Sequence, residues 1–178
     1  MKKYFIYCLI LCLLFATGPT ISAQVKPPAY PDSLFPTYYH QRVSLFNALP
    51  QTKDDIIFLG NSITDGGEWS ELFNDIKIKN RGISGDISAG VLNRLKELVN
   101  RKPSKIFLLI GTNDLARGIS ADSLLVNMML IADYVKQESP STHLYVQSIL
   151  PVNKSFGKFG GHTKNDEQIR LVNKQLKE

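Results

Sequence analysis

The sequence predicts a three-layer α/β/α fold built on a doubly wound parallel sheet. Three short runs are apolar at nearly every position, and each ends at a glycine or a proline: 55–59 before Gly60, 105–110 before Gly111 and 143–150 before Pro151. Strands that are apolar on both faces are typical of parallel sheets covered by helices. Stretches with helical periodicity separate these runs, so right-handed crossovers are expected between the strands.

The remaining elements follow in chain order. Residues 24–37 contain four prolines and predict a lead-in segment that is neither helix nor strand, a tether or a strap over the domain. Helical spacing of apolar residues begins at Tyr38 and stops at Pro50. A weaker alternating strand is expected over 76–79. Two helices are expected over 86–100 and 122–138, capped by their first residues, Asp86 and Asp122, and a last helix covers 169–176.

Composition places the chain among globular proteins of one domain, with 178 residues, 43% apolar and 21% charged. Both cysteines, Cys8 and Cys12, lie at the start, which excludes cysteine-ligated metals and a cysteine nucleophile from the rest of the chain. The first 23 residues hold two lysines and no acid, so the remainder carries 19 basic and 16 acidic residues, a net charge of +3. No basic cluster is present, and nucleic acid is not an expected partner.

The N-terminus has the pattern of an export signal. Lys2 and Lys3 precede an apolar run over 4–16 that is too short to span a bilayer. A small residue, Ala23, precedes the expected cleavage site before Gln24. We therefore expect a signal peptide over 1–23, a proline-rich lead-in over 24–37 and one domain over 38–178. The protein would be periplasmic or extracellular with no stable membrane anchor after cleavage; an uncleaved anchor is the alternative.

Candidate catalytic residues follow three of the predicted strands. In an open α/β sheet, ligands bind outside the carboxyl ends of the strands. Ser62 follows one strand and could act as a nucleophile, Gly82 follows the next and could offer its backbone N–H, and Asn113 could offer its side-chain NH₂ to an oxyanion. Each also has a structural explanation: a helix cap, a positive φ in a turn, and an Asx turn. Together they supply what acyl transfer needs.

These residues stand in motifs that resemble those of the SGNH hydrolases, the superfamily of GDSL esterases and lipases. Residues 60–64 (GNSIT), 80–82 (NRG) and 111–114 (GTND) match its first three blocks in order. The resemblance implies a flavodoxin-like SGNH fold, Ser62 as nucleophile, and an oxyanion hole formed by the N–H groups of Ser62 and Gly82 with the Asn113 side chain. It also implies catalysis without a metal or an organic cofactor.

The fourth block of the family, Asp-x-x-His, is not found in the 178 residues. His40 and His143 are expected to be structural or exposed, whereas His162 lies in a glycine-rich loop at the correct edge of the sheet. His162 is either the base or, in the interpretation we favour, a residue that lines the cleft or is solvated. We expect a C-terminally truncated domain that lacks its last β-α unit.

The function expected from these features is hydrolysis of small acyl esters, in particular acetyl esters on carbohydrates, impaired by the missing Asp and His. The substrate is then a small molecule or a carbohydrate ester. Asp65, Glu68 and Trp69 are near enough to Ser62 to contact it, although a helix start and a buried ring explain them equally. The alternative function is a noncatalytic SGNH scaffold that binds an acylated sugar.

Overall fold

The computed structural model describes residues 24–177, whose four parallel strands form one sheet with the order β2-β1-β3-β4. The strands are β1 (Ile56–Gly60), β2 (Ile78–Gly82), β3 (Lys105–Leu109) and β4 (His143–Val146). In the register of the sheet, Gly60 is paired with Gly82 and with Leu109, so the carboxyl ends of β1, β2 and β3 lie level. The predicted α/β parallel sheet is confirmed, and the candidate residues after these strands share one edge.

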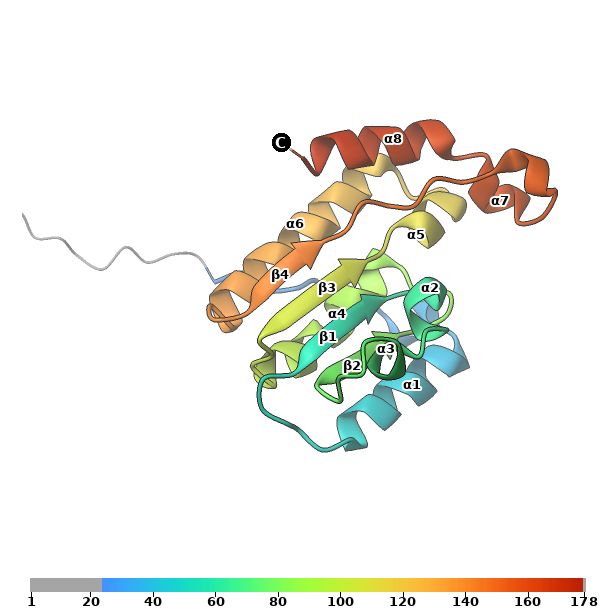
Figure 1. The fold of residues 1–178 in the computed structure, drawn as a ribbon. Helices are drawn as coiled ribbons and strands as arrows, with labels where there is room; N and C mark the ends of the chain where they lie inside the picture. Colours follow the sequence, from blue (N-terminus) through green and yellow to red (C-terminus); the bar gives the residue numbers. More distant parts are fainter. Residues whose placement is uncertain (1–23, 178) are drawn as a thin grey trace, which may run out of the picture.

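Helices flank the sheet, as Figure 1 shows. The long ones are α1 (Thr37–Ala48), α4 (Ser88–Asn100), α6 (Ala121–Glu138) and α8 (Asp166–Gln175). Ile57 and Leu59 of β1 share one core cluster with residues of α4 and α6, whereas Phe58, on the opposite face, stacks on Trp69 of α3 (Trp69–Leu72). The sheet therefore lies between a layer that contains α4 and α6 and a side that carries α3.

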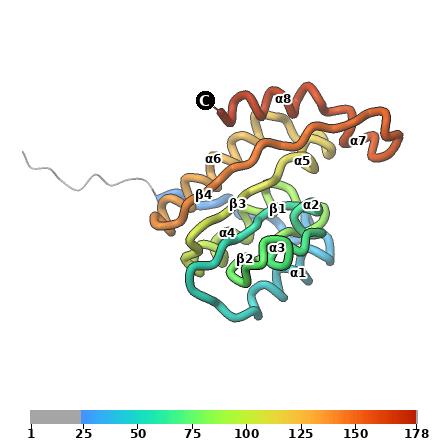
Figure 2. Tube along the Cα trace, viewed as in Figure 1, coloured from blue at the N-terminus to red at the C-terminus, as the bar shows by residue number. Residues whose placement is uncertain are grey.

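The chain after β4 runs to the carboxyl edge of the sheet and then turns back. It passes through η2 (Lys154–Phe156) and α7 (Gly160–Thr163) before α8 returns along α6 (Figure 2). Ile169 and Val172 fix α8 to the main core, where they are 2% and 0% exposed. This path places α7, which contains His162, near the carboxyl ends of the strands.

Two of the predicted helix caps are wrong. Helix α6 is capped by Ser120, whose Oγ accepts the Ser123 N–H at 3.1 Å, so Asp122 is the second helical residue. Helix α4 begins at Ser88, and the Asp86 carboxylate pairs with Arg94 at 2.9 Å while accepting the Ile87 N–H. Burial explains the difference for Asp86, since a carboxylate that is 4% exposed needs a cation.

The proline-rich lead-in is a strap. After a short 3₁₀ turn, η1 (Asp32–Leu34), it leads directly into α1, and further back the Val25 N–H donates to Gln137 Oε1 of α6 at 2.7 Å. Val25 and Tyr30 pack against the core. The expected signal peptide lies outside the described residues. Within residues 24–177, no helix has the length and hydropathy that crossing a bilayer requires.

Candidate active site

Ser62 lies in the turn that follows β1, as the first residue of the short helix α2 (Ser62–Asp65). Asn61 caps this helix with its Oδ1, which accepts the Ile63 N–H at 3.0 Å, and its side chain is buried. Gly60 has no room for a Cβ, because the Leu109 carbonyl and Thr64 Oγ1 occupy the place. The strand therefore ends in a fixed turn that leaves Ser62 exposed at the edge of the sheet.

Gly82 does not lie where its place in the NRG motif predicts. It is buried at the end of β2, where a Cβ would collide with the Asp65 backbone, and its N–H donates to Asn80 Oδ1 at 2.8 Å. It does not have a positive φ. The Gly82 N–H is therefore already used, and the close approach of α2 to β2 is the reason for glycine here. The prediction of Gly82 as an oxyanion donor is corrected on this point.

The next glycine, Gly85, has the properties that were expected of Gly82. Its φ is +81°, its carbonyl accepts from Arg117 Nη2 at 2.7 Å, and no acceptor within residues 24–177 takes its N–H. The following residue, Asp86, accepts at its backbone oxygen from Asn113 Nδ2 at 2.8 Å. Gly85 therefore directly precedes the residue whose carbonyl holds the Asn113 amide. The sequence offered the clue that Gly85, like Gly82, belongs to the turn after β2.

Asn113 is held at both ends of its amide. It is 8% exposed in α5 (Thr112–Ala116), the helix that begins after Gly111 with its φ of +122°. The Asp86 carbonyl can only accept, so the atom that faces it is the NH₂ group and the atom that faces His162 is Oδ1. Because Oδ1 also only accepts, His162 Nε2, 2.9 Å away, carries the proton. One Nδ2 hydrogen of Asn113 remains for a ligand.

Two buried carboxylates support these turns. Arg94 pairs with Asp86 and also donates to the carbonyls of Arg81 at 2.9 Å and Gly60 at 3.3 Å, the ends of β2 and β1. Asp114 is 0% exposed and accepts from both the N–H and the Oγ of Ser88, at 3.0 and 2.5 Å. Burial raises the pKa of Asp86 against the opposing effect of Arg94, and burial likewise raises the pKa of Asp114 against its hydrogen bonds from Ser88.

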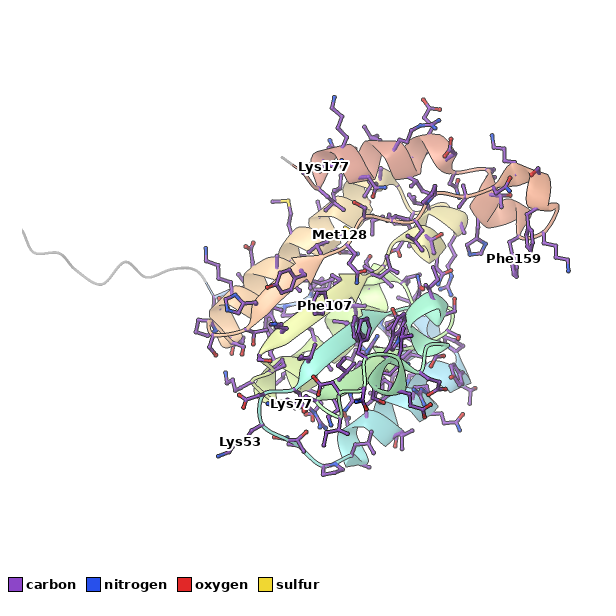
Figure 3. The ribbon with its side chains drawn as sticks, viewed as in Figure 1. Lys53, Lys77, Phe107, Met128, Phe159 and Lys177 are labelled. Atoms are coloured by element: carbon purple, nitrogen blue, oxygen red, sulfur yellow. The ribbon has the colours of Figure 1, made fainter. Side chains whose placement is uncertain are left out.

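A cleft of about 490 Å³ opens at this edge of the sheet, and most of its wall is apolar. Its lining comes from the turns after β1 and β3 and from the segment after β4: Ser62, Ile63, Thr112, Asn113, Val152, Asn153, Phe156, Phe159, His162 and Thr163. Figure 3 shows Phe159 projecting from the segment that leads into α7. Ser62, Asn113 and His162 thus come together, and the expectation that His162 lines the cleft is confirmed.

The other candidates lie elsewhere. His40 is exposed on α1 with its Nε2 3.2 Å from the Asp32 carbonyl, and His143 is exposed at the amino end of β4. Trp69 donates from Nε1 to the Thr64 carbonyl at 2.7 Å, and Asp65 accepts from Ser84 Oγ at 2.7 Å. Neither lines the cleft, nor does Glu68, so a structural role explains them. Residues 24–177 contain no cluster of side chains suited to a metal ion.

Comparison with known protein families decides the classification. The model of the GDSL-like Lipase/Acylhydrolase family matches residues 58–178, which is more than half of the chain and includes all three motifs of the cleft. The chain belongs to this family. As a member of this family it has the SGNH fold, as the motifs after β1, β2 and β3 indicated.

Relatives of this family member include the platelet-activating factor acetylhydrolase IB subunit alpha2 of Homo sapiens. The two are 32% identical over 103 residues, which are 54% of this chain and 44% of the relative. The chain therefore spans less than half the length of the curated relatives that it matches. A GDSL-like lipase from Bacteroides thetaiotaomicron VPI-5482 is 25% identical, with a TM-score of 0.65 over 78% of this chain and 71% of the other.

A third similarity concerns the fold alone. The acetylxylan esterase Axe2 from Geobacillus stearothermophilus is 18% identical to this chain and superposes with a TM-score of 0.51. The alignment covers 69% of this chain and 71% of Axe2. Proteins of this fold thus include an esterase whose name gives an acetylated polysaccharide as substrate.

Proposed function

We propose that this acylhydrolase is a serine esterase that cleaves small acyl esters, with acetyl esters of carbohydrates as its substrate class. The observation that carries the proposal is the placement of Ser62 and Asn113 on the wall of one cleft at the carboxyl edge of the sheet. The name of one relative, an acetylhydrolase, supports the acetyl group, and a protein of the same fold is named an acetylxylan esterase.

In this mechanism Ser62 Oγ attacks the ester carbonyl carbon, and the carbonyl oxygen becomes an oxyanion. Three neutral donors stabilise it: the Ser62 N–H, the free hydrogen on Asn113 Nδ2 and the Gly85 N–H, which replaces that of Gly82. The bond to the alcohol then breaks, and the alcohol leaves with the proton that came from Ser62. Water hydrolyses the acyl-Ser62 intermediate and releases the acid.

Proton transfer from Ser62 is the step for which the 178 residues provide no evident proton acceptor. They contain no Asp-x-x-His, and no side chain of residues 24–177 accepts a hydrogen bond from Ser62 Oγ. Loss of the histidine of a triad lowers kcat by about 10⁶, whereas the oxyanion hole and binding alone keep about 10³ to 10⁴ over water. We therefore expect this chain to hydrolyse an activated acetyl ester far more slowly than a complete triad would, with no more than the residual rate of the oxyanion hole and binding.

The test compares the purified protein with Ser62→Ala on p-nitrophenyl acetate and on acetylated xylan, with and without added imidazole. A cleft of about 490 Å³ has room for imidazole beside a small ester, and imidazole can take the proton of Ser62. The expected result is a small rate that needs Ser62 and that imidazole increases. Equal rates for both proteins under all conditions would contradict the proposal.

The second candidate function is a noncatalytic protein that binds acylated sugars. It is favoured because no side chain within residues 24–177 accepts a hydrogen bond from Ser62 Oγ. It predicts saturable binding of acetylated xylo-oligosaccharide without release of acetate, and binding that Ser62→Ala leaves intact.

Export remains a prediction from the sequence, and detection of a mature protein that starts at Gln24 would test it.

A further inference from the structure

His162 contacts Asn113, the side chain that donates a hydrogen bond to the oxyanion in the proposed function. Its Nε2 lies 2.9 Å from Asn113 Oδ1, although the two residues are 49 positions apart in the chain. Both line the cleft with Ser62. The ring of Phe159 stands edge-on to the His162 ring, with centroids 6.0 Å apart and an angle of 88° between the planes.

The hydrogen-bond network assigns the proton on this histidine. The Asp86 carbonyl orients the Asn113 amide, so its Oδ1 faces Nε2, and Nε2 must donate. A nitrogen that donates to Asn113 has no lone pair for the proton of Ser62. In this arrangement the Nε2 atom of His162 is therefore not a general base.

The contact has a chemical consequence for Asn113. Donation to the amide oxygen draws electron density from Nδ2 and makes its remaining N–H a stronger donor, because hydrogen bonds in a chain polarise one another. It also prevents rotation of the amide, which would turn its oxygen toward the oxyanion. Asn113 is thus held between the Asp86 carbonyl and His162, with one N–H free for a ligand.

We propose that His162 is a positioning residue, which fixes and polarises the Asn113 amide as an oxyanion donor. The kinetic part of this inference rests on the proposed esterase function. Asn113→Ala should lower kcat by about 10² to 10³, the usual effect of losing one oxyanion donor. His162→Ala should lower kcat roughly tenfold with KM unchanged, because the contact acts through Asn113 in the transition state.

The double variant separates positioning from base catalysis. If His162 acts through Asn113, Asn113→Ala/His162→Ala is no slower than Asn113→Ala alone, and His162→Gln restores the rate by donating from its amide nitrogen. If His162 is the base, the double variant loses the further factor of His162→Ala, and Gln does not restore the rate. His143→Ala, which removes an exposed histidine at the opposite edge, is the matched control and should leave the rate unchanged.

Nuclear magnetic resonance tests the contact without catalysis. The ring ¹⁵N signals should show a protonated Nε2 in neutral His162, and the side-chain NH₂ signals of Asn113 should shift in His162→Ala and return in His162→Gln. A bare Nε2, or Asn113 signals that do not respond, would overturn the proposal. If no hydrolysis depends on Ser62, the esterase function fails, and these signals still decide whether His162 positions Asn113.

Discussion

Arg94 offers the sharpest test of how the carboxyl edge of the sheet is held. Its guanidinium donates to Asp86 Oδ2 from Nη2 at 2.9 Å and from Nε at 3.2 Å, and the two side chains are only 4% and 1% exposed. Arg94→Met keeps the bulk of the side chain and leaves the Asp86 carboxylate buried without its cation. Breaking a buried pair in this way costs about 3–5 kcal/mol, a large part of the about 5–15 kcal/mol that stabilises a domain.

Urea unfolding, followed by the fluorescence of Trp69, the single tryptophan, measures this loss in the free energy of unfolding. The double variant Asp86→Asn/Arg94→Met should be about 1–3 kcal/mol more stable than Arg94→Met, because the unpaired buried carboxylate is removed. It should not regain the full stability, because the carbonyls of Gly60 and Arg81 still lack the Arg94 donor.

The control is Arg170→Met, which removes the exposed pair with Asp166, whose side chains are 72% and 31% exposed. It should cost about 0.3–0.5 kcal/mol. A loss of unfolding free energy in Arg94→Met no larger than in this control, or a double variant no more stable than Arg94→Met, would contradict a stabilising role of the buried pair.

Two further predictions concern stability. Burial raises the pKa of Asp114 above its ordinary value of about 3.9. Between these two values the native state binds more protons than the unfolded chain, so the contribution of this carboxyl to stability falls as the pH rises. The difference in unfolding free energy between wild type and Asp114→Asn should therefore shift in favour of wild type as the pH falls from 7 toward 4; a difference independent of pH would contradict it. Gly82→Ala should lower the free energy of unfolding by about 1–3 kcal/mol or more, because its Cβ would collide with the Asp65 backbone. The control Gly160→Ala places its Cβ in open space and should cost less than about 1 kcal/mol. Equal losses in thermal or urea unfolding would be inconsistent with this packing.

Much of the fold could be predicted because its main signals are local. The apolar runs that become β1 and β3 are continuous in the sequence, and before α1 the proline-rich lead-in forms only a short 3₁₀ turn. The approximate site was also predictable, since the carboxyl ends of parallel strands meet at one edge. Ser62 and Asn113 follow two such strands and line the same cleft.

The details that failed depend on tertiary contacts. The sequence pattern predicts that Asp86 caps a helix, but in the structure its buried carboxylate pairs with Arg94. The pattern likewise predicts that Gly82 offers its N–H to a ligand, but this N–H donates to Asn80 Oδ1. The contact between His162 and Asn113 arises because α7 lies beside α5, which no local pattern encodes. The family motifs located the correct turns. The hydrogen bonds and backbone angles within those turns distinguish Gly82 from Gly85.

The central claim, that Ser62 is the nucleophile of the cleft, is tested most directly by mass spectrometry of the protein after incubation with p-nitrophenyl acetate. Because p-nitrophenolate is a much better leaving group than a serine alkoxide, Ser62 should be acetylated faster than acetyl-Ser62 is hydrolysed. Acetyl-Ser62 should then accumulate, and peptide mapping should place the acetyl group on the peptide that contains Ser62. The modification should be absent from Ser62→Ala and reduced in Asn113→Ala. Acetylation confined to lysine side chains, or equal in wild type and Ser62→Ala, would contradict the account.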